Sequence, residues 1–310
     1  MPTWSDLLKE IAAARDASMQ VYDRLRRKYL EQLSTYLEKP VIVYASAFLQ
    51  KPDASINELM MSNDDMEGFM EVVHGLRTRE VYLVLHSPGG AAETAESIVR
   101  YLRSKFDRIT VVVPHMAKSA ATMLACAAEQ IIIAKHGELG PIDPQFVLQT
   151  PLGLRMVPAL SIINQFSAAA DDVRRNQQAA AIWYPMLAQY GPGLLEEATQ
   201  AVELSELLVK EWLASYMFNG RRNAKRLASR VARYLADYDR HKTHRRRLGH
   251  DALSRRGMNV TLLESDQKLQ DLVMTVYHAT MHTFANTAAF KIIENHTGKA
   301  FIRLLRQPQS

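Results

Sequence analysis

The sequence predicts an α/β protein in which a buried parallel sheet carries a mainly helical extension. Short apolar runs alternate with helical patterns between residues 41 and 134, at the spacing of strand–helix–strand crossover units. Runs such as EVYLVLH and RITVVV are apolar throughout, as expected of parallel strands that are covered on both faces. From about residue 158 to residue 256 the pattern is mainly helical. The fold class is therefore α/β, with the extension completing one core.

The elements follow in order along the chain. Residues 3–38 carry apolar residues at helical spacing, and Pro40 ends that pattern. Strands are predicted at 41–48, 80–86, 108–114, 130–134 and 258–264. Helices are predicted at 63–76, 91–104, 118–129 and 266–286. The segment 135–145 is predicted as a loop from its Gly and Pro content, and breaks in the helical region are predicted at Pro185, 191–193 and 219–223. Two short apolar segments close the chain.

This pattern divides the chain into three parts. They are an N-terminal helix over 1–40, an α/β core over 41–157, and a mainly helical extension over 158–310 that completes the core rather than forming an independent domain. With 310 residues, 47% hydrophobic and 23% charged, the composition is that of an ordinary globular protein.

Targeting features are absent from the sequence. Cys126 is the only cysteine, so no disulfide can form within the chain, and a reducing compartment is expected. The N-terminus lacks the basic start and apolar centre of a signal peptide. No uncharged apolar run reaches the roughly 20 residues that a spanning helix needs. We expect a cytoplasmic protein without a transmembrane segment.

The net charge of +5 has a local origin. Between residues 219 and 256 there are 13 Lys or Arg residues against 3 Asp residues. Such a segment is able to contact nucleic acid or an acidic surface. A solvated helical face is the favoured interpretation, because only Tyr234 and Tyr238 are available there for base stacking.

Cofactor and metal signatures are also missing. His241 and His244 are three residues apart but have no nearby carboxylate or cysteine in the pattern of a metal site. The sequence contains no P-loop and no dinucleotide-binding fingerprint. We therefore expect neither a metal nor a cofactor.

Two turns are predicted at the carboxyl ends of neighbouring strands, where parallel sheets bind their ligands. HSPGG (86–90) ends one strand and PHMAKSAA (114–121) ends the next. Gly89 and Gly90 have no side chains, so their amides can approach a substrate carbonyl. Ser119 lies where a helix begins, next to the outward-pointing amide of Ala120. Each turn alone is typical of a tight turn or a helix cap. Together they favour a serine nucleophile facing an oxyanion hole.

These stretches resemble the Clp protease/crotonase superfamily, in the branch that includes Clp protease and signal peptide peptidase A. The chain is most similar there to the serine dehydrogenase proteinase family, through LHSPGGAAETAESIVRYLR, AKSAATMLACAAEQIIIAKHGELGPIDPQ, THRRRLGHDAL and KIIENHTGKAFI. The resemblance implies a Clp/crotonase-like fold and serine peptidase activity on a peptide or protein substrate. It implies Ser119 as the nucleophile, and Gly90 with Ala120 as oxyanion donors beside Gly89. It also implies a homo-oligomer.

The resemblance implies one of two kinds of base for Ser119, because relatives use either a Ser-His-Asp triad or a Ser-Lys dyad. Clp proteases have a histidine about 25 residues after the serine, where this chain has Asp143 in PIDPQ. Relatives of signal peptide peptidase A have a lysine about 40–50 residues after it, but here no lysine occurs between Lys135 and Lys210. Neither pattern fits cleanly.

Three residues remain as candidates for the activating group. Asp143 is suited to orient a histidine from another segment. His244 lies in KTHRRR, which resembles a Thr-His motif of the family. Lys118 adjoins the nucleophile, but adjacent side chains on a helix diverge. Weaker candidates are His115, His136 and His250.

Three functions are compatible with this sequence. The first is a cytoplasmic serine peptidase that forms an acyl-enzyme. The second is a catalytically silent Clp-like scaffold or binding protein, to which a missing base would point. The third is a crotonase-type acyl-CoA enzyme, which is disfavoured because SPGG suits an extended peptide and no adenine-binding signature is present.

Overall fold

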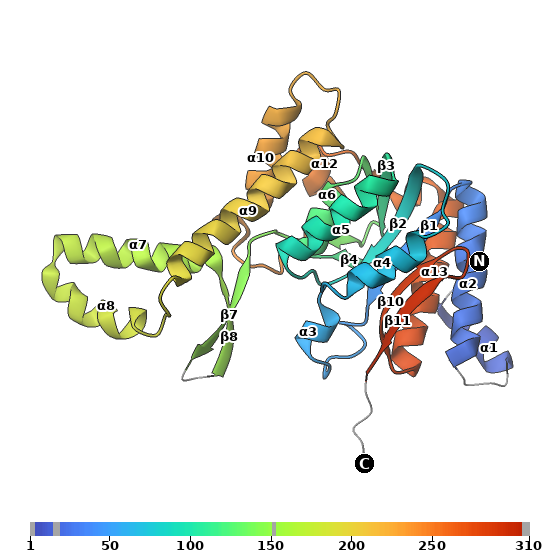
Figure 1. The fold of residues 1–310 in the computed structure, drawn as a ribbon, viewed down its shortest axis with the longest axis horizontal. Coiled ribbons are helices and arrows are strands. Elements are labelled where there is room, and N and C mark those ends of the chain that lie inside the picture. The colour runs from blue at the N-terminus through green and yellow to red at the C-terminus, as the bar shows by residue number, and fades with distance from the viewer. Residues whose placement is uncertain (1–3, 15–18, 151–152, 306–310) are drawn as a thin grey trace, which may run out of the picture.

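A seven-stranded sheet forms the centre of the molecule (Figure 1). The structure is a computed structural model that describes residues 4–14, 19–150 and 153–305. Five strands run parallel, and two C-terminal strands add to one edge in antiparallel pairing, in the order β11-β10-β1-β2-β3-β5-β9. The strands are β1 (Val41–Ser46), β2 (Glu80–His86), β3 (Arg108–Val113), β5 (Gln130–Ile133), β9 (Val260–Leu262), β10 (Ala289–Asn295) and β11 (Ala300–Leu304). The predicted α/β class with a parallel-rich core is confirmed.

Helices cover both faces of this sheet. The side chains of successive strand residues point to opposite faces of the sheet and form two apolar clusters. Tyr44 and Leu85 belong to one cluster, and Val43 and Val84 belong to the other. The first face packs against α4 (Asp65–Val73), α5 (Ala92–Lys105), α6 (Ala120–Cys126), α9 (Leu194–Ser215) and α10 (Ala224–Ala236). The second packs against α1 (Trp4–Ala13), α2 (Met19–Leu37) and α13 (Gln267–Asn286). The two turns that the sequence singled out, at 86–90 and 114–121, thus lie on a sheet that is buried on both sides.

The N-terminal pattern forms two helices, α1 and α2, within the predicted range 3–38. Residues 3 and 15–18 of that range lie outside the described part. The predicted loop 135–145 contains a two-residue strand, β6 (Glu138–Leu139), which pairs with β4 (Met116–Ala117). A short helix, α3 (Ile56–Leu59), precedes α4.

A hairpin that was not predicted from the sequence precedes the helical extension. Strands β7 (Gln145–Thr150) and β8 (Gly153–Pro158) pair in antiparallel fashion. Next, α7 (Ala159–Arg175), the 3-10 turn η1 (Gln177–Ala179) and α8 (Ala180–Leu187) project away from the sheet (Figure 1). The chain then returns through α9 and α10 to the core. The last short elements are α11 (Tyr238–His241), α12 (His250–Ser254) and η2 (Leu263–Ser265).

The predicted break at Pro185 is wrong, because this residue lies inside α8. A proline removes one backbone donor and clashes with the preceding turn, which disfavours but does not forbid a helix. In a helix as short as α8, few backbone hydrogen bonds are affected. Within the described residues, no helix is both long enough and apolar enough to cross a membrane.

Candidate active site

Backbone hydrogen bonds join the two turns that the sequence singled out. The Ser87 amide donates to the Met116 carbonyl at 3.0 Å, and the Lys118 amide donates to the Ser87 carbonyl at 3.0 Å. Gly89, at a φ of +98°, lies so close to Ser119 that a Cβ added to it would be 2.6 Å from the Ser119 Cβ. A side chain at Gly89 would therefore displace the serine. The turns lie together at one edge of the sheet, as their spacing predicted.

Ser119 has a backbone conformation that a helix cap does not require. Its φ is +51° and its ψ is −122°, a region that residues with a Cβ rarely adopt. Its hydroxyl makes no capping hydrogen bond to α6. Such strain costs of the order of 1–3 kcal/mol and tends to occur where function demands an unusual orientation. The cap explanation for this serine thus loses its support.

Two backbone amides beside Ser119 are available to a ligand. Within the described part of the chain, neither the Gly90 nor the Ala120 amide donates a hydrogen bond to another residue. Ala120 is the first residue of α6, where helix geometry leaves the amide without an internal acceptor. The Gly89 amide, in contrast, is directed to the Ser87 hydroxyl at 3.2 Å. Gly90 and Ala120 are therefore better placed than Gly89 to hold an oxyanion.

The Gly89–Gly90 turn is held in place by the segment that precedes α4. The Met61 amide donates to the Gly89 carbonyl at 2.7 Å. A Cβ at Gly90 would lie 2.3 Å from the Met61 carbonyl oxygen, so no larger residue fits there without moving the backbone.

A buried ion pair anchors that segment in turn. The Lys291 ammonium lies 2.8 Å from Asp65 Oδ1, and neither side chain is accessible to solvent. Lys291 also donates to the Met60 carbonyl at 2.8 Å, while Asp65 accepts from the Ser62 amide at 2.9 Å and the Tyr44 hydroxyl at 2.7 Å. Burial lowers the pKa of Lys291, opposed by the Asp65 charge. Met60 and Ser62 are thereby held by the ion pair, on either side of Met61, which contacts the Gly89–Gly90 turn.

Asp143 and His244 form a hydrogen-bonded pair across 101 residues of sequence. His244 Nδ1 lies 2.9 Å from Asp143 Oδ1. Asp143 is buried, and its other oxygen accepts from Gln145 Nε2 at 2.7 Å. The His244 side chain remains 22% exposed. Because Nδ1 is bound to the carboxylate, Nε2 is the ring nitrogen left to act on a substrate or nucleophile.

The segment that carries Asp143 passes directly beside the turn that carries Ser119. β6 pairs with β4, and the Lys118 ammonium donates to the Leu139 carbonyl at 3.2 Å. Leu139 and Leu248 exchange both backbone hydrogen bonds, at 3.0 and 3.1 Å. The segments that carry Asp143 and His244 are thus joined to each other through Leu139 and Leu248, and Leu139 is joined to Lys118, the residue before Ser119.

Lys118 is engaged in a different interaction. Its ammonium lies 2.8 Å from Glu138 Oε1 and is largely buried. Burial lowers the pKa of Lys118, while the hydrogen bond to Glu138 acts in the opposite direction. This pairing directs the ammonium to Glu138 and gives Lys118 a structural task beside Ser119.

The weaker histidine candidates have other partners. His115 Nδ1 lies 2.9 Å from the Tyr277 hydroxyl, and His250 Nδ1 lies 3.0 Å from Asp251. His136 is exposed on the surface. Among the residues that the structure describes, no group of three or more His, Cys, Asp or Glu side chains is arranged to hold a metal ion.

Sequence reasoning missed one member of the site, Gln145. The residue stands in PIDPQ only two positions after Asp143, and its amide fixes the carboxylate oxygen that His244 does not use. A polar residue so close to a candidate catalytic aspartate was the available signal. The strain at Ser119 had no signal in the sequence.

The segment that contains both turns matches a protein family. Residues 55–177 match the model of the ClpP-like SDH-type serine proteinases. The resemblance seen in the sequence is confirmed. Ser119, Gly90 and Asp143 all lie within the matched residues, whereas His244 lies beyond them.

Two uncharacterized proteins of Methanocaldococcus jannaschii are similar to this chain. One is 34% identical over 91 residues, which are 29% of this chain and 28% of the relative. The other is 30% identical over 115 residues, which are 37% of each chain. The aligned segments thus span about a third of the length of these relatives.

Two solved structures follow a similar chain path. Both are mutants of a 1510-N membrane-bound stomatin-specific protease, and the second is in complex with a substrate peptide. The first has a TM-score of 0.40 at 14% identity and covers 69% of this chain and 79% of its own. The second has a TM-score of 0.37 at 16% identity and covers 65% and 70%. A likeness of this degree does not extend to mechanism.

Proposed function

We propose that this protein is a serine peptidase in which Ser119 is the nucleophile and the Asp143–His244 pair is its base. The observation that carries the proposal is the backbone of Ser119. The serine is strained, its hydroxyl makes no capping hydrogen bond, and it packs against the Gly89–Gly90 turn next to the free amide of Ala120, within a segment that matches a serine proteinase family. The hydrogen bond between Asp143 and His244 supplies the orienting group that the sequence left open.

The proposed reaction proceeds by acyl transfer. His244 Nε2 accepts the proton of the Ser119 hydroxyl as its oxygen attacks the peptide carbonyl carbon. The amides of Gly90 and Ala120 donate to the resulting oxyanion. His244 then returns the proton to the leaving amine as the C–N bond breaks. A water molecule attacks the acyl-enzyme with the same base and releases the second product.

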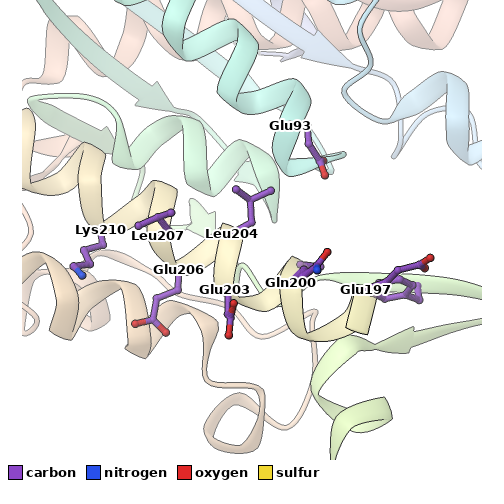
Figure 2. A pocket seen from close by; sticks show the side chains of 10 residues that line it. Glu93, Glu197, Gln200, Glu203, Leu204, Glu206, Leu207 and Lys210 are labelled. Atoms are coloured by element: carbon purple, nitrogen blue, oxygen red, sulfur yellow. The ribbon is translucent and has the colours of Figure 1, made fainter. Parts of the chain in front are cut away.

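A groove of about 900 Å³ runs along α9, opposite two residues that follow the candidate site segments in the sequence. Phe146 follows the Asp143 segment, and Glu93 lies at the start of α5, soon after Gly90. Figure 2 shows Glu93 across from Leu204 on α9, with further carboxylates along that helix. The lining combines apolar side chains with four glutamates, Glu93, Glu197, Glu203 and Glu206, against one lysine, Lys210. This charge favours peptide substrates with basic side chains.

Labelling by a fluorophosphonate probe tests the nucleophile. The native protein should be labelled, and mass spectrometry should place the adduct on Ser119. Ser119→Ala should remove labelling and peptide hydrolysis together. Ser97→Ala, an exposed serine on α5, is the matched control and should behave as the native protein. Absence of labelling in the native protein would contradict the proposal and favour a silent scaffold.

Paired peptides test the groove. A peptide with lysine should be hydrolysed with a higher kcat/KM than the same peptide with glutamate at that position. Glu203→Gln should reduce this preference, whereas Glu211→Gln, exposed on α9 but outside the groove, should not. An equal preference in all three proteins would show that the groove does not select substrates.

A further inference from the structure

The basic segment of the chain folds into a pocket whose rim consists largely of arginines. A pocket of about 500 Å³ is lined by Arg226, Arg230 and Arg233 of α10, by Arg240 of α11, and by Arg256 just after α12. A second hollow of about 330 Å³ shares Arg226 and Arg230 and continues along α10. The guanidinium groups therefore meet from three elements, which a single solvated helical face would not produce.

Most of this charge is not neutralised by the protein. Arg233 lies 3.3 Å from Glu206, and Arg240 lies 3.8 Å from Asp237, each through its Nε. For Arg226, Arg230 and Arg256, no carboxylate partner exists among the described residues. Like charges that converge in a concavity repel each other, and the cost is relieved when an anion binds between them.

Tyr234 orients part of the rim. The Arg256 guanidinium lies 4.0 Å from the centre of the Tyr234 ring, and the Arg240 guanidinium lies 5.7 Å from it. A guanidinium that stacks on a ring keeps its edge free to donate a pair of parallel hydrogen bonds. Phosphate oxygens match this fork in spacing and charge.

We propose that this arginine pocket binds a ligand that carries several linked phosphate groups, such as inorganic triphosphate or the tail of a nucleoside triphosphate. The volume falls within the range of small-molecule sites, roughly 300–1,000 Å³. A nucleic acid is disfavoured, because Tyr234 is already covered by Arg256 and is the one aromatic side chain among the lining residues. Three unpaired guanidiniums match a ligand with several adjacent negative charges better than a single phosphate.

Isothermal titration calorimetry with inorganic triphosphate at about 0.15 M salt tests the site, because surface charge is largely screened there. The double variant Arg226→Gln/Arg230→Gln should bind at least about tenfold more weakly, since charge-assisted hydrogen bonds are lost. Arg222→Gln/Lys225→Gln removes the same charge from exposed residues of the same segment that do not line the pocket. This control should bind as the native protein does. Arg256→Lys keeps the charge but loses the fork, and should bind with intermediate affinity.

Separate ligands distinguish the sources of phosphate. Binding of both inorganic triphosphate and a nucleoside triphosphate, with weaker binding of orthophosphate, supports the proposal. Equal weakening in the pocket and control variants would overturn it, because the binding would then be diffuse. Failure of triphosphate to bind the native protein would also overturn it. So would tighter binding of single-stranded oligonucleotides that depends equally on Arg222 and Lys225.

Discussion

Removal of one member of the buried Lys291–Asp65 ion pair should destabilise the protein, whereas neutralisation of both members should have a much smaller effect. Lys291→Met leaves the Asp65 carboxylate without a counter-ion at a position with no solvent access. Removal of one partner from a buried ion pair costs about 3–5 kcal/mol. The carboxylate keeps its bonds from Tyr44 and Ser62, so we expect the lower part of that range. The double variant Asp65→Asn/Lys291→Met restores a neutral site and should recover most of the loss.

The size of the effect can be converted into a melting temperature. An unfolding entropy of about 2.1 cal/mol/K per residue over 310 residues gives about 0.65 kcal/mol/K, so about 3 kcal/mol lowers Tm by roughly 5 °C. Differential scanning calorimetry measures this shift. Lys299→Met is the matched control, since Lys299 pairs with Glu71 at 3.9 Å on the surface. An exposed pair contributes about 0–1 kcal/mol, so Tm should fall by no more than roughly 2 °C.

The Lys291→Met substitution should also affect the reactivity of Ser119. Lys291 and Asp65 fix residues 60–62, and Met61 holds the Gly89–Gly90 turn. Probe labelling of Ser119 should therefore slow in Lys291→Met even at temperatures where the protein is folded. A Tm within about 2 °C of the native value, equal to that of the surface control, would refute the reasoning.

Four further predictions concern acid stability, the base, the oxyanion hole and assembly. Burial, with a contribution from His115, lowers the pKa of His86 to about 3. The unfolded chain takes up this proton near pH 6.5, so stability is fully present above that value and declines as the pH falls towards 3; at pH 5 the decline due to His86 is about 2 kcal/mol. His86→Phe, which retains the stacking on a neighbouring aromatic ring, should lessen this decline in urea titrations between pH 7 and pH 5, and an unchanged slope would show that His86 does not titrate in this way. Asp143→Asn and His244→Ala should each reduce kcat sharply, and the double variant should be little worse than the more damaging single one, because triad members act as a unit; multiplicative losses would argue against a triad. Gly90→Val should reduce kcat/KM by about 10²–10³ or more, because loss of one oxyanion donor has that effect in a studied protease, and near-native kinetics in a folded variant would make this turn merely structural. Static light scattering should give a mass that is a multiple of 35.1 kDa, and a mass of one chain at micromolar concentration would exclude self-association.

The sequence allowed the core of the fold to be predicted because its signals are local. Buried strands such as 80–86 and 108–113 are continuous apolar runs, and the crossover rule then orders them in a parallel sheet. The hairpin at 145–158 was not predicted, because neither strand has a continuous buried apolar run and both begin among prolines. Its structure depends on pairing with itself and on packing against α7 and α9.

The candidate site was predictable where one short motif carries it. The glycines at 89–90 and the serine at 119 stand in recognisable turns. The resemblance to the Clp protease/crotonase superfamily then implied an oxyanion hole for the glycines and a nucleophile for the serine. The Asp143–His244 pair was one of several open alternatives, since a contact between residues 101 apart leaves no mark in spacing. Lys291 and Asp65 are 226 residues apart and were not singled out, for the same physical reason. Backbone strain is likewise a property of the folded chain.

The strained backbone of Ser119 sets stability and activity against each other at one position. Glycine tolerates a φ of +51° without a Cβ penalty, so Ser119→Gly should relieve the strain that the hydroxyl-bearing residue imposes. The variant should melt at a higher temperature than the native protein and lose its reactivity towards the probe. In a scaffold protein, glycine at this position would raise stability at no functional loss. In an enzyme, the lower stability of serine is the consequence of holding its hydroxyl oxygen in a reactive orientation.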